Sequence, residues 1–223
     1  MIIFVAACDK NEDLFFPFHW CMEKYWPDHP QILYSTESVK NPYYDTICKN
    51  YDLDHWTTRL RESLEEIGDD VILFMVDDIF LRRPVEDKHK KRIKYAENLF
   101  GGNIALVNFE KEWDNGKGNE DVGLAGFKRR VKGNFRISLM CGLWDRKKLI
   151  DILEVDSNPW YVENAQDTKG YEYYINSGEL ILDWGYTTFE HVSVMSGKWC
   201  REVMPFFKKE GIKMDYEKRG FYD

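Results

Sequence analysis

The 223-residue sequence lacks any run of about 18 apolar residues, which is the length that a helix needs to cross a bilayer. Its first ten residues have no basic stretch before their short apolar run, and an acid follows at once at Asp9. This pattern predicts a buried strand rather than a signal peptide. We therefore expect a cytoplasmic protein without a membrane span.

Cysteines are few, and acidic residues outnumber the lysines and arginines. The five cysteines are odd in number and lack CxxC spacing, which argues against a disulfide framework or a zinc cluster and favours reduced thiols. A net charge of −8 disfavours a protein that binds mainly by coating nucleic-acid phosphates with lysine and arginine. What is present is apolar: 43% hydrophobic residues suffice for one sizeable core, so we predict a single domain over 1–223.

Short apolar runs alternate with amphipathic segments along the chain. The runs predict strands, and the segments with helical spacing predict helices. The strands are expected at 2–7, 31–35, 71–76, 101–107, 137–144, 180–184 and 186–195, and the helices at 14–26, 55–67, 87–100, 146–153 and from 157 onward. A β-α-β start of this kind predicts a right-handed crossover into a parallel sheet, and hence an α/β fold.

The strand expected at 71–76 is the most hydrophobic run of the chain, and it ends abruptly at Asp77 and Asp78. In open α/β sheets, ligands bind outside the carboxyl ends of the strands. Two adjacent carboxylates repel each other in a low dielectric, so a positive group is expected beside them. A divalent ion such as Mn²⁺ or Mg²⁺ can bridge such acids to a substrate diphosphate. The alternative is that the pair only caps a loop, since aspartate is common in turns.

The segment 71–81, VILFMVDDIFL, resembles the GT-A glycosyltransferases, especially small bacterial and phage members, in which such a strand delivers an acidic motif to metal and sugar nucleotide. The resemblance implies a Rossmann-type sandwich with a mainly parallel central sheet flanked by helices. It places the nucleotide-sugar half at about 1–110 and the acceptor half at about 111–223. Asp78 would hold the ion and Asp77 the ribose or sugar hydroxyls, or the reverse. The two acids are adjacent, which departs from a strict DxD motif.

The same resemblance suggests where the donor nucleotide binds. Ala7 and Asp9 follow the first strand, and Lys198 lies on a glycine turn where it can contact a diphosphate. Arg59 borders the apolar stripe of its helix, so we prefer it to Arg61 as a contact for the base or ribose. Ordinary strand packing for Asp9 and solvent exposure for Arg59 are the open alternatives.

Residues for the acceptor come from two further segments that resemble the family. Gly142 permits close backbone approach, and Trp144 offers an aromatic face to a sugar, although a core tryptophan fits equally. Trp160 and Glu163 lie in a phrase typical of these small transferases. Glu163 is the candidate general base, because inversion requires a group that takes the proton of the attacking hydroxyl. A first-turn glutamate that only stabilises its helix is the alternative.

His191 follows an apolar-aromatic stretch at a place where many GT-A enzymes hold a third metal ligand. A neutral imidazole suits manganese, although a lone histidine is as often structural. The implied cofactor is therefore Mn²⁺ or Mg²⁺ on Asp77, Asp78 and His191.

The predicted function is transfer of a hexosyl or pentosyl group from a nucleotide-sugar, preferably a UDP-sugar, to a hydroxyl acceptor. The acceptor is a saccharide or, for a phage enzyme acting in the host cytoplasm, a hydroxymethylated DNA base, for which the basic cluster at 128–132 could line a groove. Two alternatives remain. A nucleotidyltransferase would require a glycine-rich, lysine-bearing loop after the first strand, which residues 9–13 do not supply. The other is an inactive module that binds sugar nucleotides.

Overall fold

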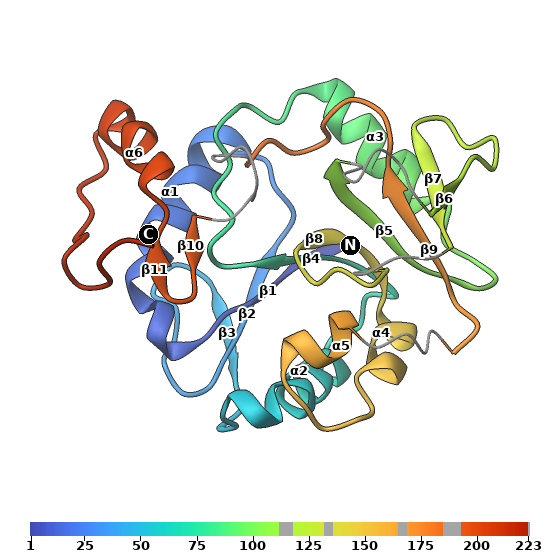
Figure 1. Ribbon diagram of the computed structural model, residues 1–223, viewed down its shortest axis with the longest axis horizontal. Helices are drawn as coiled ribbons and strands as arrows, with labels where there is room; N and C mark the ends of the chain where they lie inside the picture. Colours follow the sequence, from blue (N-terminus) through green and yellow to red (C-terminus); the bar gives the residue numbers. More distant parts are fainter. Residues whose placement is uncertain (112–117, 132–135, 165–168, 185–192, 223) are drawn as a thin grey trace.

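The computed structural model describes residues 1–111, 118–131, 136–164, 169–184 and 193–222 (Figure 1). One large sheet runs through them in the strand order β3-β2-β1-β4-β8-β5-β9-β7-β6. In chain order its strands are β1 Ile2–Ala6, β2 Ile32–Thr36, β3 Asp45–Cys48, β4 Val71–Val76, β5 Ile104–Lys111, β6 Asn119–Glu120, β7 Phe127–Arg130, β8 Cys141–Asp145 and β9 Glu172–Asn176. Within the described sheet β7 and β8 run against the other strands, so the sheet is mainly parallel, as expected.

Helices cover both faces of this sheet (Figure 1). They are α1 Phe15–Tyr25, α2 Trp56–Glu65, α3 Asp87–Glu97, α4 Arg146–Ile152, α5 Pro159–Asn164 and α6 Met204–Glu210. Side chains alternate across a strand, so neighbouring residues of β1 enter different cores. Ile3 and Val5 pack in the core shared with α1, α3 and α6, whereas Phe4 packs in the core shared with α2, α4 and α5. The result is the three-layer α/β sandwich that the sequence predicts.

The first and fourth strands end at the same level of the sheet. Val5 pairs with Met75 and Ala6 with Val76 in a parallel register. The residues that follow the two strands therefore emerge side by side at one edge of the sheet. This edge is the carboxyl end, where α/β folds bind their ligands.

The C-terminal segment returns to the first part of the chain. A short hairpin of β10 Val194–Met195 and β11 Lys198–Trp199 precedes the 3₁₀ turn η4, Arg201–Val203, and α6. α6 ends at Gly211, whose positive φ of 72° allows the left-handed stop. The last residues then run back to β11, where Phe221 bridges to Trp199.

Several elements differ from the prediction. The short strand β3 and the strand β9 were not predicted, and the polar stretch after β5 contains β6 and β7. The strand expected at 180–184 is wrong, because those residues form bends and irregular structure. Most of the strand expected at 186–195 lies outside the described residues. In the described ranges, no helix has the length and apolar character that crossing a bilayer requires.

Candidate active site

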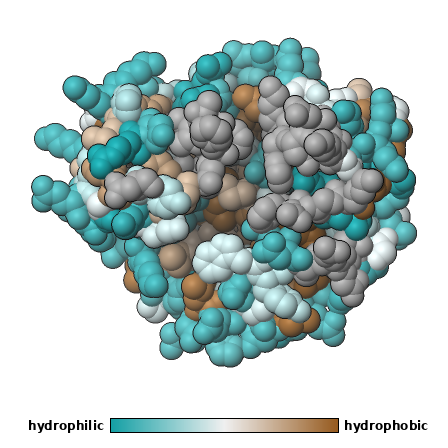
Figure 2. All heavy atoms as spheres, in the orientation of Figure 1, coloured by the Kyte–Doolittle hydropathy of each residue, from teal (hydrophilic) through white to brown (hydrophobic). Residues whose placement is uncertain are grey.

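A cavity of about 250 Å³ opens at the carboxyl edge of the sheet. Its walls come from the ends of β1 and β4, from the residue after β2, from the start of α2 and from α5. Among the predicted residues it brings together Ala7, Asp77, Asp78 and Glu163. Teal, hydrophilic residues cover most of the rim of the face in Figure 2, and brown, apolar residues lie near its centre.

Asp77 is a buried carboxylate with one free oxygen. Only 3% of the residue is exposed, and its Oδ1 accepts a hydrogen bond of 2.9 Å from Asn11 Nδ2. Its Oδ2 is buried and has no hydrogen-bond partner among the described residues. Burial, and then the charge of Asp78, raise the pKa of Asp77 well above its ordinary value. Burial also raises the pKa of Asp78, to about 7.

This pair fits a divalent ion. An unpartnered buried carboxylate oxygen beside a second acid is a costly arrangement that a cation relieves. No group of three or more histidine, cysteine, aspartate or glutamate side chains that could hold a metal occurs in the described ranges. Magnesium is often held by one or two protein carboxylates together with substrate phosphates, so two acids suffice. The predicted third ligand, His191, lies outside the described residues.

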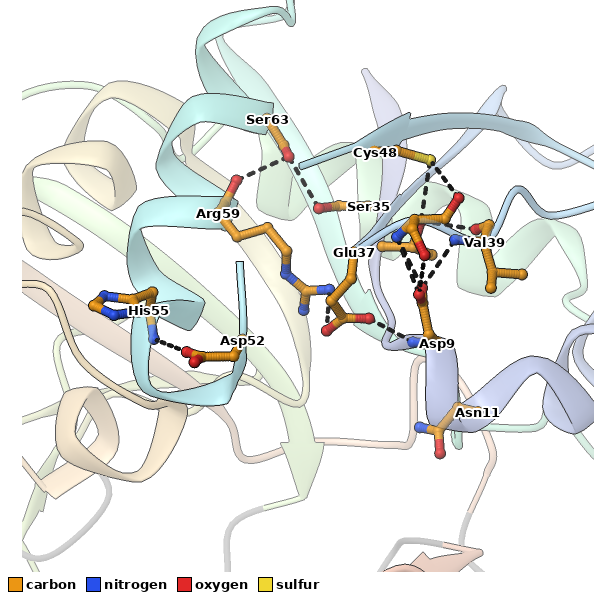
Figure 3. A network of polar contacts seen from close by, with 12 residues as sticks. Asp9, Asn11, Ser35, Glu37, Val39, Cys48, Asp52, His55, Arg59 and Ser63 are labelled. Atoms are coloured by element: carbon orange, nitrogen blue, oxygen red, sulfur yellow. Dashed lines mark hydrogen bonds and ion pairs between the residues drawn. The ribbon is translucent and has the colours of Figure 1, made fainter. Parts of the chain in front are cut away.

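A buried ion pair forms the wall next to Asp77. Arg59, 1% exposed, reaches from α2 to Glu37, and its Nη1 lies 2.7 Å from Glu37 Oε1 (Figure 3). The other Glu37 oxygen accepts the backbone N–H of Asp9. The Nε and Nη2 of Arg59 are buried and have no hydrogen-bond partner in the part of the chain that the structure describes. Burial lowers the pKa of Arg59, whereas Glu37 raises it. Arg59 therefore acts on the cavity through Glu37, which lines it.

The sequence interpretation missed Glu37. It follows β2 directly, and an acid at the end of the second strand is the group that often binds a ribose in Rossmann-type folds. Its place after the strand was therefore an available signal.

Asp9 points toward the loop after β2 and holds it in place (Figure 3). Its carboxylate accepts hydrogen bonds from the backbone and side chain of Ser38 and from the backbone of Val39. Burial raises its pKa, but these hydrogen bonds outweigh burial and lower the pKa to about 2. Asp9 does not line the cavity.

Glu163 lines the same cavity as the acidic pair. It lies on α5, and its Oε1 accepts a hydrogen bond of 2.8 Å from the backbone N–H of Leu139. Burial raises its pKa to about 7, although the Leu139 N–H lowers it, and the charge of Glu110 raises it further. A carboxylate with such a pKa can take up a proton near neutral pH.

Two of the predicted acceptor residues serve packing in β8. Trp144 is fully buried, and its ring meets Tyr173 edge to face at 6.5 Å, so it presents no face to a ligand. A side chain at Gly142 would place its Cβ 2.9 Å from the backbone oxygen of Val107, so the glycine allows β5 and β8 to approach each other. The close approach is thus to a strand and not to a sugar.

Two other predicted residues lie at the surface. Trp160 is 57% exposed on α5, and it adjoins Pro159, which lines the cavity. Lys198 is exposed on β11 and is not part of the cavity wall.

No protein-family model and no curated protein sequence matches the chain. Solved structures do. A CMP:2-keto-3-deoxy-manno-octonic acid synthetase complexed with CTP superposes with a TM-score of 0.51 at 9% identity, over 79% of this chain and 89% of that one. TarS of S. aureus gives 0.49 at 10% identity over 80% of this chain and 36% of that one. The galactosyltransferase LgtC, in complex with donor and acceptor sugar analogues, gives 0.42 at 14% identity over 68% and 60%.

The likeness to the synthetase shows the fold. The chain has a GT-A-like, Rossmann-type α/β fold, of the kind that glycosyltransferases and nucleotidyltransferases share. The chain covers 36% of the TarS chain and 60% of the LgtC chain, which is less than two thirds of each.

Proposed function

We propose that the protein is a metal-dependent glycosyltransferase that moves a sugar from a nucleotide-sugar, preferably a UDP-sugar, to a hydroxyl acceptor. The observation that carries the proposal is the unpartnered Oδ2 of Asp77, buried beside Asp78 in a cavity that Glu163 also lines. The acidic pair requires a positive ligand, and Glu163 offers a base. A donor diphosphate with its cation and an acceptor hydroxyl satisfy both.

The donor nucleoside binds where Glu37 lines the cavity. The Glu37 carboxylate accepts hydrogen bonds from ribose hydroxyls or from an N–H of the base, and its ion pair with the buried Arg59 keeps it oriented. The small side chain of Ala7 leaves room for the nucleoside beside it. Asp77 and Asp78 hold Mn²⁺ or Mg²⁺. The ion supplies charge stabilisation for the departing diphosphate.

Glu163 takes the proton of the acceptor hydroxyl. As the acceptor oxygen bonds to the anomeric carbon, the bond from that carbon to the phosphate oxygen breaks, and the nucleoside diphosphate leaves with the electron pair. Direct attack by the deprotonated acceptor hydroxyl displaces the diphosphate in line, so the proposed reaction inverts the anomeric configuration. The product anomer, read by NMR, tests this point, and retention would remove the role of Glu163.

The loop after β1 favours this function over nucleotidyl transfer. A nucleotidyltransferase cradles a triphosphate in a glycine-rich loop at this place, because backbone N–H groups must approach the phosphates closely. Here residues Asp9–Leu14 form the 3₁₀ turn η1, which has no glycine. The backbone N–H of Asp9 is used by Glu37.

A saccharide is the favoured acceptor, and a hydroxymethylated DNA base is the second candidate. DNA binding would require free cations near the cavity. Within the basic cluster, however, Arg129 forms ion pairs with Glu120 and Glu172, and Arg130 is only 4% exposed. Lys132 lies outside the described residues.

The proposal is tested by hydrolysis and transfer with a panel of nucleotide-sugars, with and without Mn²⁺. Asp78→Ala is expected to abolish metal-dependent turnover in a folded protein. Asp70→Ala is the matched control, because Asp70 lies just before the same strand with its side chain 83% exposed. Full turnover in Asp78→Ala, or equal loss in both variants, contradicts the proposal. Binding of sugar nucleotide without turnover in the native protein would identify an inactive module.

A further inference from the structure

Arg219, near the C-terminus, reaches the acidic pair through one intermediate residue. Its guanidinium forms a forked pair with Asp13, from Nε to Oδ2 at 2.7 Å and from Nη2 to Oδ1. The same Nη2 donates to Asn11 Oδ1 at 3.0 Å and to the Lys10 carbonyl at 2.9 Å. Asn11 Nδ2 in turn donates to Asp77 Oδ1 at 2.9 Å. A continuous chain of hydrogen bonds thus joins the two ends of the sequence.

The donors and acceptors of Arg219, Asn11 and Asp77 determine the direction of each hydrogen bond between them. A guanidinium has only donors, so the atom of Asn11 that faces it must be the amide oxygen. The amide nitrogen of Asn11 is then turned toward Asp77. A carboxylate that receives this N–H on Oδ1 is held with Oδ2 directed elsewhere, and Oδ2 is the atom without a partner.

The backbone holds Arg219 in register. Trp199 N–H donates to the Gly220 carbonyl at 3.0 Å, and Tyr222 N–H donates to the Trp199 carbonyl at 2.9 Å, so bonds to β11 anchor the residues that directly follow the arginine. Gly220 has a positive φ of 65°, which lets the chain turn directly after Arg219. The guanidinium carbon also lies 5.9 Å from the centre of the Trp199 ring. The arginine side chain is 7% exposed.

We propose that Arg219 is a positioning residue for the acidic pair, because it orients Asn11 so that Asp77 keeps one carboxylate oxygen for the ligand of the cavity. This inference rests on the proposed function for the nature of that ligand, a divalent cation with the donor diphosphate. Arg219 itself does not bind the phosphates, since its fork is occupied by Asp13 and its side chain is buried. Groups that orient metal ligands in this way typically contribute about 10- to 100-fold to metal affinity.

The test compares Arg219→Ala, Asn11→Ala and the double variant by calorimetric titration with Mn²⁺. Each single variant is expected to weaken Mn²⁺ binding by about 10-fold or more. If Arg219 acts through Asn11, the double variant binds Mn²⁺ no more weakly than Asn11→Ala alone, whereas independent effects would multiply. A multiplied loss in the double variant overturns the proposal.

Two further variants separate geometry from charge. Arg219→Lys keeps the charge but cannot fork to Asp13 while it holds Asn11, so it is expected to bind Mn²⁺ as weakly as Arg219→Ala. Full Mn²⁺ affinity in Arg219→Lys overturns the proposal. Lys218→Ala is the matched control, because Lys218 lies 3.6 Å from Asp13 Oδ1, is half exposed and belongs to the same segment. It should bind Mn²⁺ as the native protein does.

A second readout does not depend on metal. The side-chain amide signals of Asn11, assigned from their loss in Asn11→Ala, are followed by NMR in the metal-free protein. Arg219→Ala and Arg219→Lys should shift these signals and speed their hydrogen exchange, and Lys218→Ala should not. Unchanged signals overturn the proposal. If the native protein binds no Mn²⁺ while the signals respond as expected, the proposed function fails and the positioning of Asn11 by Arg219 stands.

Discussion

The replacement Asp77→Asn should make the metal-free protein more stable while it removes metal binding. The native carboxylate is buried, has an oxygen without a partner and adjoins Asp78. Asparagine has nearly the same shape and retains Oδ1, so the bond from Asn11 survives. The substitution therefore removes an acid that the folded protein can ionise only at a cost, with little change in packing.

The sign of the effect depends on pH. Burial raises the pKa of Asp77 in the folded protein, whereas the unfolded chain titrates near the ordinary value of 3.8. As pH rises above about 4, the unfolded state releases this proton and the folded state retains it, so the native protein loses stability with increasing pH. Asparagine resembles the protonated form at every pH. The gain should therefore be small at pH 5 and larger at pH 8.

The magnitude follows from the cost of an unpaired buried charge. Such a charge costs several kcal/mol, and the new amide leaves a donor unpartnered at about 1 kcal/mol, so a net gain of about 2 kcal/mol is expected at pH 8. For a chain of this length, that gain corresponds to a rise in Tm of about 4–8 °C. Thermal unfolding in EDTA at pH 5 and pH 8 measures it.

The control is Asp70→Asn, which changes an exposed acid before the same strand and should leave Tm unchanged at both pH values. Saturating Mn²⁺ should raise the Tm of the native protein and not that of Asp77→Asn, since only the former retains the site. A lower Tm for Asp77→Asn at pH 8, or an equal shift at both pH values, would refute the account of Asp77 as an uncompensated buried charge.

Three further substitutions test other parts of the structure. Glu163→Gln should reduce kcat by about 100-fold or more, and the native rate should fall as pH drops through about 7, since a base must be deprotonated; a pH profile without this limb contradicts its role. Gly142→Ala should lower the free energy of unfolding by about 1–3 kcal/mol in urea, whereas Gly68→Ala, with open space around it, should not. Arg59→Met should cost about 3 kcal/mol by removing the ion-pair partner of Glu37, and adding Glu37→Gln should recover part of this loss.

The fold could be predicted from the sequence where the pattern is local. The six-residue apolar run of β4 and the charged amphipathic faces of α2 and α3 have a single periodicity each, and all three elements are found. Strands β3 and β9 were missed. β3 has only four residues, all exposed or half-buried, and therefore no hydrophobic run. The run at 180–184 is apolar enough for a strand. Its apolar side chains pack in the core, but its backbone does not pair with a strand of the described sheet.

The site was predictable only in part, for a related reason. Asp77 and Asp78 follow a strand whose end position is fixed by its hydrophobic length, so their place at the sheet edge follows from the sequence. Asp9 follows a strand as well, but Ser38 and Val39 offer it three donors, and tertiary contacts of this kind leave no local pattern. Trp144 is fully buried because its strand is central, and composition alone does not distinguish a core tryptophan from one that stacks on a sugar.

The C-terminal segment matters to the site, although no local sequence pattern pointed to it. Asp77, Asp78 and Glu163 all have raised pKa values, so without a ligand the cavity concentrates proton-retaining acids at one place. Folded proteins retain such unfavourable clusters of buried acids mainly at functional sites, where a bound ligand offsets their cost. The acids alone do not determine which oxygen faces that ligand. That choice falls to Asn11, which Arg219 orients from 208 residues away, so the orientation of the acidic pair depends on a contact that forms only once the whole chain has folded.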